Sequence, residues 1–106
     1  MTQKELELFI NVITTLGQKN QHAVAIEELQ ELGKELTKVL RDKPSRMKIA
    51  EELADVLICI DQIKLMHGIS DNEIKIFRDY KIKRLNYMYD KGVYKWKTLK
   101  ENHGQH

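Results

Sequence analysis

Two pairs of acidic residues have the type and spacing that binding of a metal ion requires. Glu28 and Glu31 form one pair, Glu52 and Asp55 form the other, and each pair is separated by three positions. Because residues three apart on a helix are neighbours on one face, each pair points two carboxylates at one place. Carboxylate oxygens suit hard divalent cations, and Mg²⁺ is the first candidate.

Glu52 is the acid that solvation explains least well. At about 100° per residue on a helix, Glu52 falls within the apolar stripe of its segment, and Asp55 lies at the edge of that stripe. Glu51, by contrast, points well away from the stripe, as a solvated residue does. A carboxylate directed toward a core is costly unless it is paired or bound to a metal.

The two pairs also match in height along a hairpin. The midpoint between Glu28 and Asp55 lies between residues 41 and 42. The midpoint between Glu31 and Glu52 is the same, and we expect the chain to reverse at residues 42–45. In an antiparallel hairpin the four acids therefore lie within about one helical turn of each other. They cannot all stay ionised there without a cation.

Two other interpretations of these acids compete with a metal site. The first is that they are ordinary surface residues of two Glu-rich helices, since a single Glu-x-x-Glu step is common. The second is a ferritin-like di-iron bundle, which needs Glu-x-x-His; no His follows a Glu by three positions here, so we set it aside. Two matched pairs, with one acid in an apolar stripe, favour the metal site.

Four helical segments must position these acids. Apolar residues recur at helical spacing in the first segment up to Gly17, and then over about 21–41 and about 45–67. Pro44 ends the second segment and opens the third. Ser70 and Glu73 form a capping box that begins the fourth segment, which runs to about residue 90. We predict an all-α fold, an antiparallel bundle of about four helices, with residues 1–92 as its domain and 93–106 as a basic tail.

Single residues add two expectations about packing. Gly33 lies inside the second segment, where it costs about 1 kcal/mol relative to Ala, and so indicates a close helix contact. Cys59 is expected to be buried, because a reactive thiolate favours positive neighbours and this one has acids.

Composition limits the classes of protein. The chain has 106 residues, 42% hydrophobic and 32% charged, with one Pro and one Cys. Its longest strictly apolar run is residues 56–60, so we predict no membrane span, and the N-terminus resembles no signal peptide. A single Cys excludes an internal disulfide. We predict a soluble, cytoplasmic protein. A domain of this size buries only ~60–70% of its unfolded surface, so a partner subunit is expected to add burial.

Charge is spread unevenly. Residues 1–74 hold nine basic and thirteen acidic residues, whereas residues 75–106 hold nine basic and three acidic ones. An acidic part followed by a basic part fits a metal site that faces an anion site, although differently charged solvated faces explain the counts equally well.

The acids also follow the order of a known signature. Glu27-Glu28-x-x-Glu31, then a helix break, then Glu52-x-x-Asp55 resembles the motif of MazG-like all-alpha nucleoside triphosphate pyrophosphohydrolases. The continuation of the second motif as far as residue 58 is also typical of that family, and the resemblance covers roughly residues 22–90.

The resemblance implies an activity and a set of site residues. Such enzymes bind Mg²⁺, with Mn²⁺ as a substitute, through four acids, which here are Glu28, Glu31, Glu52 and Asp55. They hydrolyse a nucleoside triphosphate, NTP or dNTP, to the monophosphate and pyrophosphate. Related proteins carry Lys-x-x-Asn on the last helix, near the phosphates, and this chain has Lys83 and Asn86. In related proteins a basic residue often follows three positions after the Asn, whereas this chain has Tyr89 at that position.

Catalytic roles and partners follow from the same resemblance. Glu28 or Glu31 is expected to take the proton of the attacking water. Family members form homodimers or homotetramers, and the nucleobase is often held near a subunit boundary. The rival interpretation is a non-catalytic helical module that contacts nucleic acid or a nucleotide through its basic C-terminal part. We do not expect nucleic acid or a membrane to be the partner.

Overall fold

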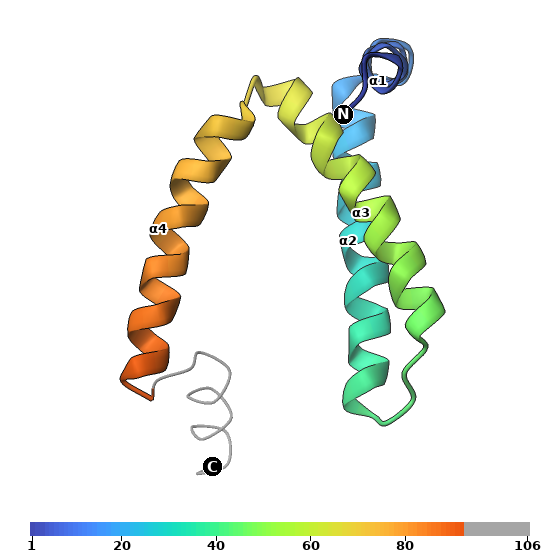
Figure 1. Cartoon of the computed structure of the whole chain (residues 1–106). Coiled ribbons are helices and arrows are strands. Elements are labelled where there is room, and N and C mark those ends of the chain that lie inside the picture. The colour runs from blue at the N-terminus through green and yellow to red at the C-terminus, as the bar shows by residue number, and fades with distance from the viewer. Residues whose placement is uncertain (93–106) are drawn as a thin grey trace. The chain divides into compact units, whose positions relative to one another are not determined.

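The computed structural model describes residues 1–92, and these residues form four helices and no strand (Figure 1). The helices are α1 (Gln3–Leu16), α2 (Gln18–Leu40), α3 (Arg46–His67) and α4 (Asp71–Asp90). The all-helical prediction is therefore confirmed for this part of the chain. The chain divides into two compact units, Met1–Ile69 and Ser70–His106, and each is treated by itself.

The break between α1 and α2 lies where the sequence predicts it. Thr2 caps α1, accepting from the backbone N–H of Glu5 at 3.1 Å, while the Glu5 carboxylate accepts from the backbone N–H of Thr2 at 2.6 Å. Gly17 ends the helix with φ of 92°, a conformation that favours glycine. The next helix starts directly at Gln18, which is three residues earlier than expected.

Helices α2 and α3 form an antiparallel hairpin joined by residues 41–45 (Figure 1). Asp42 has φ of 57° in this connection, which reverses the chain. Ser45 caps α3 by accepting from the backbone N–H of Lys48 at 3.3 Å. Pro44 lies one residue before that cap and not in the first turn of α3, and α3 begins at Arg46, within one residue of the predicted start at about 45.

The core of the first unit is small. Its buried apolar side chains are Phe9 of α1, Ala25 of α2, and Val56 and Cys59 of α3. Helix α1 contacts both other helices of the unit, and α2 and α3 contact each other. Cys59 is buried as predicted, with 7% of its surface exposed.

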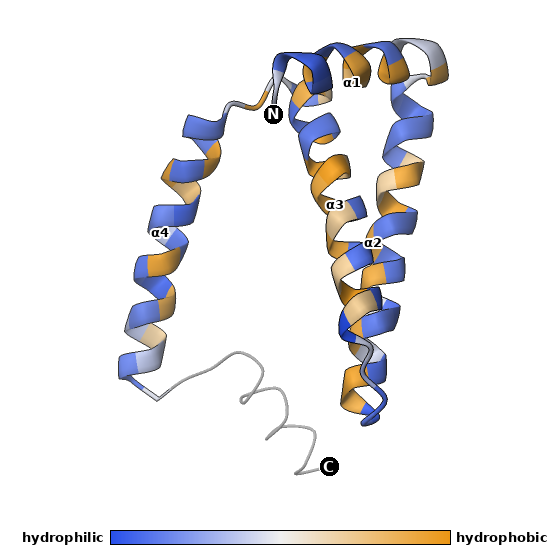
Figure 2. Cartoon of the chain, turned by 45° about the vertical axis from the view of Figure 1, so that its right-hand side comes forward, coloured by the Kyte–Doolittle hydropathy of each residue, from blue (hydrophilic) through white to orange (hydrophobic). Residues whose placement is uncertain are grey.

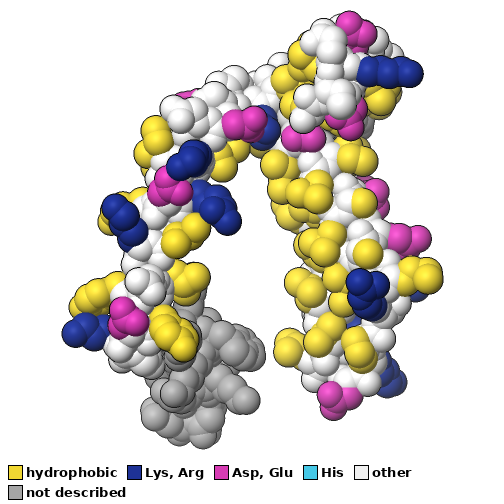
Figure 3. Space-filling model, viewed as in Figure 1, with side chains coloured by type: hydrophobic (Ala, Val, Ile, Leu, Met, Phe, Trp, Pro, Cys, Tyr) yellow, Lys and Arg dark blue, Asp and Glu magenta, His cyan; other side chains and the backbone are white. Residues whose placement is uncertain are grey.

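Many of the large apolar side chains that recur at helical spacing along α1, α2 and α3 are exposed. In α2, Ile26 is 56% exposed and Leu40 is 71% exposed, and in α3, Leu57 is 61% exposed. Figure 2 shows the hydrophobic residues along both helices, and Figure 3 shows many hydrophobic side chains on the surface of this unit. The reason is that α2 turns its small and polar residues, such as Ala25, Gln21 and Glu35, inward.

Gly33 makes no close contact in the described chain. No atom outside its own helix lies within 4 Å of the position that a Cβ would take. The close packing expected at Gly33 is therefore absent within the first unit.

Helix α4 begins with the predicted capping box. Ser70 accepts from the backbone N–H of Glu73 at 3.1 Å, and the Glu73 carboxylate accepts from the backbone N–H of Ser70 at 2.8 Å. The helix has no buried residue. Within residues 1–92, no helix combines the length and the apolar character needed to cross a bilayer.

Candidate metal centre

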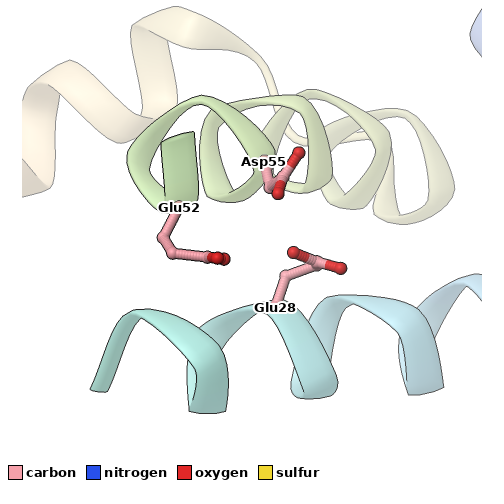
Figure 4. Close-up of side chains that lie close together, drawn as sticks. All are labelled: Glu28, Glu52 and Asp55. Atoms are coloured by element: carbon pink, nitrogen blue, oxygen red, sulfur yellow. The ribbon is translucent and has the colours of Figure 1, made fainter. Parts of the chain in front are cut away.

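Three of the four predicted metal ligands meet between α2 and α3. Glu28 comes from α2, Glu52 and Asp55 come from α3, and one carboxylate oxygen of each lies within 4.8 Å of the other two. Figure 4 shows the Glu28 side chain rising from α2 toward the two acids of α3. The hairpin thus brings together acids that are 24 and 27 positions apart in the sequence.

The spacing of these oxygens can be compared with that of ligands around a divalent cation. Oxygen ligands lie about 2.1 Å from Mg²⁺, so oxygens on opposite sides of an octahedral ion are about 4.2 Å apart. At least two of the three oxygen pairs would be adjacent ligands, about 3.0 Å apart, so the carboxylates, whose oxygens lie within 4.8 Å of one another, have to draw together around an ion. An all-oxygen set is the kind that Mg²⁺ and Mn²⁺ prefer.

One oxygen of this group lacks a hydrogen-bond partner. Oε2 of Glu52 is buried, and no donor lies within hydrogen-bonding distance of it. A buried acceptor without a donor is costly, so an oxygen left in this state points to a cation as its missing partner.

The electrostatics of Glu28 show the mutual repulsion of the group. Desolvation is the largest cause that raises the pKa of Glu28 above its ordinary value, followed by the negative charge of Asp55 and a side-chain hydrogen bond with it. The charges of Glu52 and Glu31 raise the pKa of Glu28 further. A cation bound here reverses these effects, because it stabilises the ionised form.

The pKa of Glu52 is raised by the same kinds of cause. Desolvation and then the charge of Asp55 raise the pKa of Glu52 above its ordinary value. The charges of Glu31, Glu35 and Glu51 contribute in the same direction. Glu52 is thus at the centre of a strongly negative region of the hairpin.

Glu31 lies beside this group but not within it. Its side chain is exposed, and it does not belong to the three carboxylates that converge. Its charge nevertheless raises the pKa of both Glu28 and Glu52. The assignment of Glu31 as a ligand or base remains a prediction.

A fifth acid, Glu35, was missed at the level of the sequence. Glu35 is 6% exposed, and its Oε2 accepts from Nζ of Lys38 at 2.9 Å. Its other oxygen, Oε1, is buried without a hydrogen-bond partner, as is Oε2 of Glu52. Glu35 follows Glu28 by seven positions, which places both on one helical face. That spacing is the signal that identifies Glu35.

The predicted phosphate ligands lie in the other unit. Lys83 and Asn86 are both exposed and are three positions apart on α4. Residues three apart share one face of a helix, so the two side chains are neighbours. Their role in phosphate binding stays a prediction.

Cys59 is packed next to the acids and is not a nucleophile. Burial raises the pKa of its thiol above the ordinary value, and the charges of Glu28 and Asp55 raise the same pKa further. A raised pKa keeps the sulfur protonated and unreactive near neutral pH. Its role is therefore to fill space behind the carboxylates.

The converging carboxylates have the donor chemistry to hold a divalent cation. Comparisons of the chain with protein-family models, with curated proteins and with solved structures find no match.

Proposed function

We propose that the protein is a Mg²⁺-dependent hydrolase that cleaves nucleoside triphosphates, NTP or dNTP, to nucleoside monophosphate and pyrophosphate. The observation that supports this most is the convergence of Glu28, Glu52 and Asp55, with an oxygen of Glu52 buried and unpartnered. The order of the acids along α2 and α3 resembles that of MazG-like pyrophosphohydrolases, which is the second support.

The chemistry follows from charge. A triphosphate is a polyanion, so the acids alone repel it. Bound Mg²⁺ supplies positive charge that polarises the α-phosphoryl group, activates water and neutralises the leaving pyrophosphate. In such reactions the protein contributes mainly positioning and electrostatic stabilisation.

The acids of the hairpin divide the work. Glu28, Glu52 and Asp55 hold the cation, because their oxygens lie within 4.8 Å of one another. Glu31 accepts the proton of the attacking water, since it is exposed and close enough for its charge to affect two members of the group. Glu31 is therefore our choice between the two candidate bases.

Helix α4 supplies the proposed contacts to the outer phosphates. The ammonium group of Lys83 and the side-chain amide of Asn86 are both hydrogen-bond donors, which phosphate oxygens accept. Helix α4 carries five basic and four acidic residues, so its net charge is small, whereas nucleic-acid binding favours a strongly basic surface.

The protein is proposed to act as a homodimer or homotetramer. Exposed aliphatic side chains such as Ile26, Leu29, Leu53 and Leu57 leave a large apolar surface on α2 and α3. Monomeric proteins rarely expose contiguous apolar surface of this kind. A second copy packed on it completes the antiparallel bundle that the sequence predicts. Light scattering after size-exclusion chromatography gives the mass that tests this assignment.

A substrate panel tests the activity. The purified protein is incubated with each NTP and dNTP and Mg²⁺, and monophosphate and pyrophosphate are quantified. We expect both products in equal amounts from at least one substrate, and none when EDTA replaces Mg²⁺. Release of orthophosphate instead of pyrophosphate, or no product from any nucleotide, overturns the proposal.

A matched pair of variants locates the reaction. Glu52→Gln removes the partly buried charge and should abolish product formation, while Glu51→Gln alters an exposed neighbour on the same helix and should not. Circular dichroism confirms that both variants keep the helical content of the wild-type chain. Equal activity of Glu52→Gln and wild type places the reaction elsewhere.

A further inference from the structure

Two histidines of the first unit meet away from the carboxylates. His22 lies in α2 and His67 is the last residue of α3. Their Nε2 atoms are 2.8 Å apart, and their rings are perpendicular, with an interplanar angle of 88° and centroids 5.0 Å apart. His22 is six positions from Glu28, about 9 Å along the helix, and His67 is twelve positions from Asp55, about 18 Å.

The hydrogen bond on the far side of His22 defines its tautomer. Nδ1 of His22 lies 2.6 Å from the backbone carbonyl oxygen of Gln18. A carbonyl oxygen only accepts, so Nδ1 carries the proton. In the neutral ring, Nε2 of His22 therefore holds a lone pair, and that lone pair faces His67.

This arrangement is the one that metal-binding histidines use. A ligating histidine almost always donates its other ring N–H to a carbonyl or carboxylate, which fixes the orientation of the ring and makes the ligand nitrogen more basic. His22 has this bond already, within a turn of its own helix. No rearrangement of the His22 ring is needed to present Nε2.

The separation of the two nitrogens is also close to that of a metal site. Zinc lies about 2.0–2.1 Å from histidine nitrogen, which puts two tetrahedral ligands about 3.3 Å apart. The observed 2.8 Å separation needs only a small opening of the pair. His67 is exposed and His22 is partly exposed, so water can fill the remaining positions around an ion.

We propose that His22 and His67 form a binding site for a divalent transition-metal ion of the class that prefers imidazole, represented by Zn²⁺, and that the bound ion staples α2 to the end of α3. The donor set is two neutral nitrogens, which suits Zn²⁺, Ni²⁺ or Cu²⁺ and not Mg²⁺. The site is independent of the proposed nucleotide hydrolysis.

Zn²⁺ bound between His22 and His67 should stabilise the fold. Among residues 1–92, His67 is followed by the segment Gly68–Ser70, which leads into α4. An ion that binds the folded hairpin and not the unfolded chain stabilises the fold in proportion to its occupancy. Zn²⁺ is therefore expected to raise the melting temperature of the protein.

The test uses a background without the remaining histidines. The chain has four histidines, and His103→Ala with His106→Ala leaves only the pair in question. Isothermal titration with Zn²⁺ is run on this background in saturating Mg²⁺, so that the carboxylates are occupied. We expect one Zn²⁺ per chain, and a loss of affinity of at least ~10-fold in both His22→Gln and His67→Gln.

Two further measurements complete the design. In the background protein itself, Zn²⁺ should shift the NMR signals of both imidazole rings at one equivalent, which tests the site even if a variant folds poorly. Adding Glu52→Gln to the background should leave the Zn²⁺ affinity unchanged. Unaltered ring signals at millimolar Zn²⁺, or equal affinity in the background and in His22→Gln, overturns the proposal and leaves the pair as a hydrogen bond.

Discussion

Helices α2 and α3 carry two groups of potential ligands. The groups differ in charge and in whether their polar atoms find hydrogen-bond partners within the chain. The carboxylate group of Glu28, Glu52 and Asp55 repels itself, and one of its oxygens is buried without a donor. The histidine pair of His22 and His67 is already satisfied, because one ring can donate to the other across 2.8 Å. The first group has no favourable partner for its charges among the described residues, and we propose a cation for it, whereas the second has a hydrogen-bonded arrangement without an ion.

This difference separates two kinds of preorganisation. In the carboxylate group the helices hold like charges together, so folding is opposed by a repulsion that the proposed cation would remove. In the histidine pair the backbone carbonyl of Gln18 orients one ring at no electrostatic cost. Donor hardness then predicts that the two groups select different ions from the same solution.

The largest expected effect is that of Glu52→Gln, which should impair the carboxylate group and leave the histidine pair intact. Glu52→Gln should lower Mg²⁺-dependent turnover by more than ~100-fold, because loss of a ligand exceeds the 10–100-fold cost of losing its supporting partner. The same variant should keep full Zn²⁺ affinity at the histidines. Turnover assays and Zn²⁺ titration of the same preparation measure both quantities.

The reciprocal variant is the control. His22→Gln should leave turnover with Mg²⁺ at the wild-type level while removing the Zn²⁺-dependent rise in melting temperature. If either variant loses both the Mg²⁺-dependent turnover and the effect of Zn²⁺, the two groups act as one site and the distinction between them is wrong.

The second effect concerns the buried charge beside the carboxylates. Lys38→Met removes the ammonium that contacts Glu35, whose side chain is only 7% exposed. The Lys38 side chain is 34% exposed, so we expect a moderate loss of unfolding free energy, about 1–2 kcal/mol, measured by urea denaturation without divalent ions. The unneutralised charge of Glu35 also acts on Glu52, so Mg²⁺ should bind more tightly.

Lys34→Met provides the matched control for this change, since Lys34 is exposed on the same helix. It should alter stability by less than about 0.5 kcal/mol. Zn²⁺ affinity at the histidines should be the same in both lysine variants. An equal loss of stability in the two variants removes the special role of the Glu35–Lys38 pair.

The third effect depends on pH. The fold raises the pKa of Glu28 above its ordinary value of 4.5, so the ionised form is disfavoured in the folded chain. Ionisation of Glu28 therefore destabilises the fold above its folded pKa, whereas below the ordinary value both folded and unfolded states are protonated and no penalty remains. In EDTA at neutral pH, Glu28→Gln should melt a few degrees higher than wild type.

The same melts across pH show whether this account is right. The advantage of Glu28→Gln should shrink as the pH falls toward the ordinary pKa and disappear below it. Saturating Mg²⁺ should reverse the order at neutral pH, because only the wild type keeps the full ligand set. A gain that persists in acid points to better packing of the amide rather than to relief of repulsion.

Local signals in the sequence predict much of this structure. Gly17 and the Ser70 capping box end and begin helices where they are observed, because caps depend on neighbouring residues alone. The meeting of Glu28 with the two acids of α3 was also predictable, since the hairpin reversal fixes which residues lie at one height.

The remainder depends on packing that periodicity does not specify. An apolar stripe predicts one buried face of a helix, yet Ile26 and Leu57 lie exposed because α2 and α3 meet through other faces. His22 and His67 are 45 positions apart, and nothing in their local sequence indicates a contact. Glu35 lies seven positions after Glu28, outside the three-residue step that relates Glu28 to Glu31.

The smallest effect comes from a change on α2 that touches neither ligand group. Gly33→Ala adds a methyl group where no atom outside the helix lies within 4 Å, so it should stabilise the described fold by up to about 1 kcal/mol through helix propensity. Thermal melts at low protein concentration measure this gain, and the affinities for Mg²⁺ and Zn²⁺ should both match wild type. A loss of stability that grows with protein concentration indicates instead that a second copy packs against Gly33, because a tight contact between subunits has no room for the added methyl group. That outcome places the subunit interface on this face of α2 and restores, between copies, the close contact that the glycine predicts.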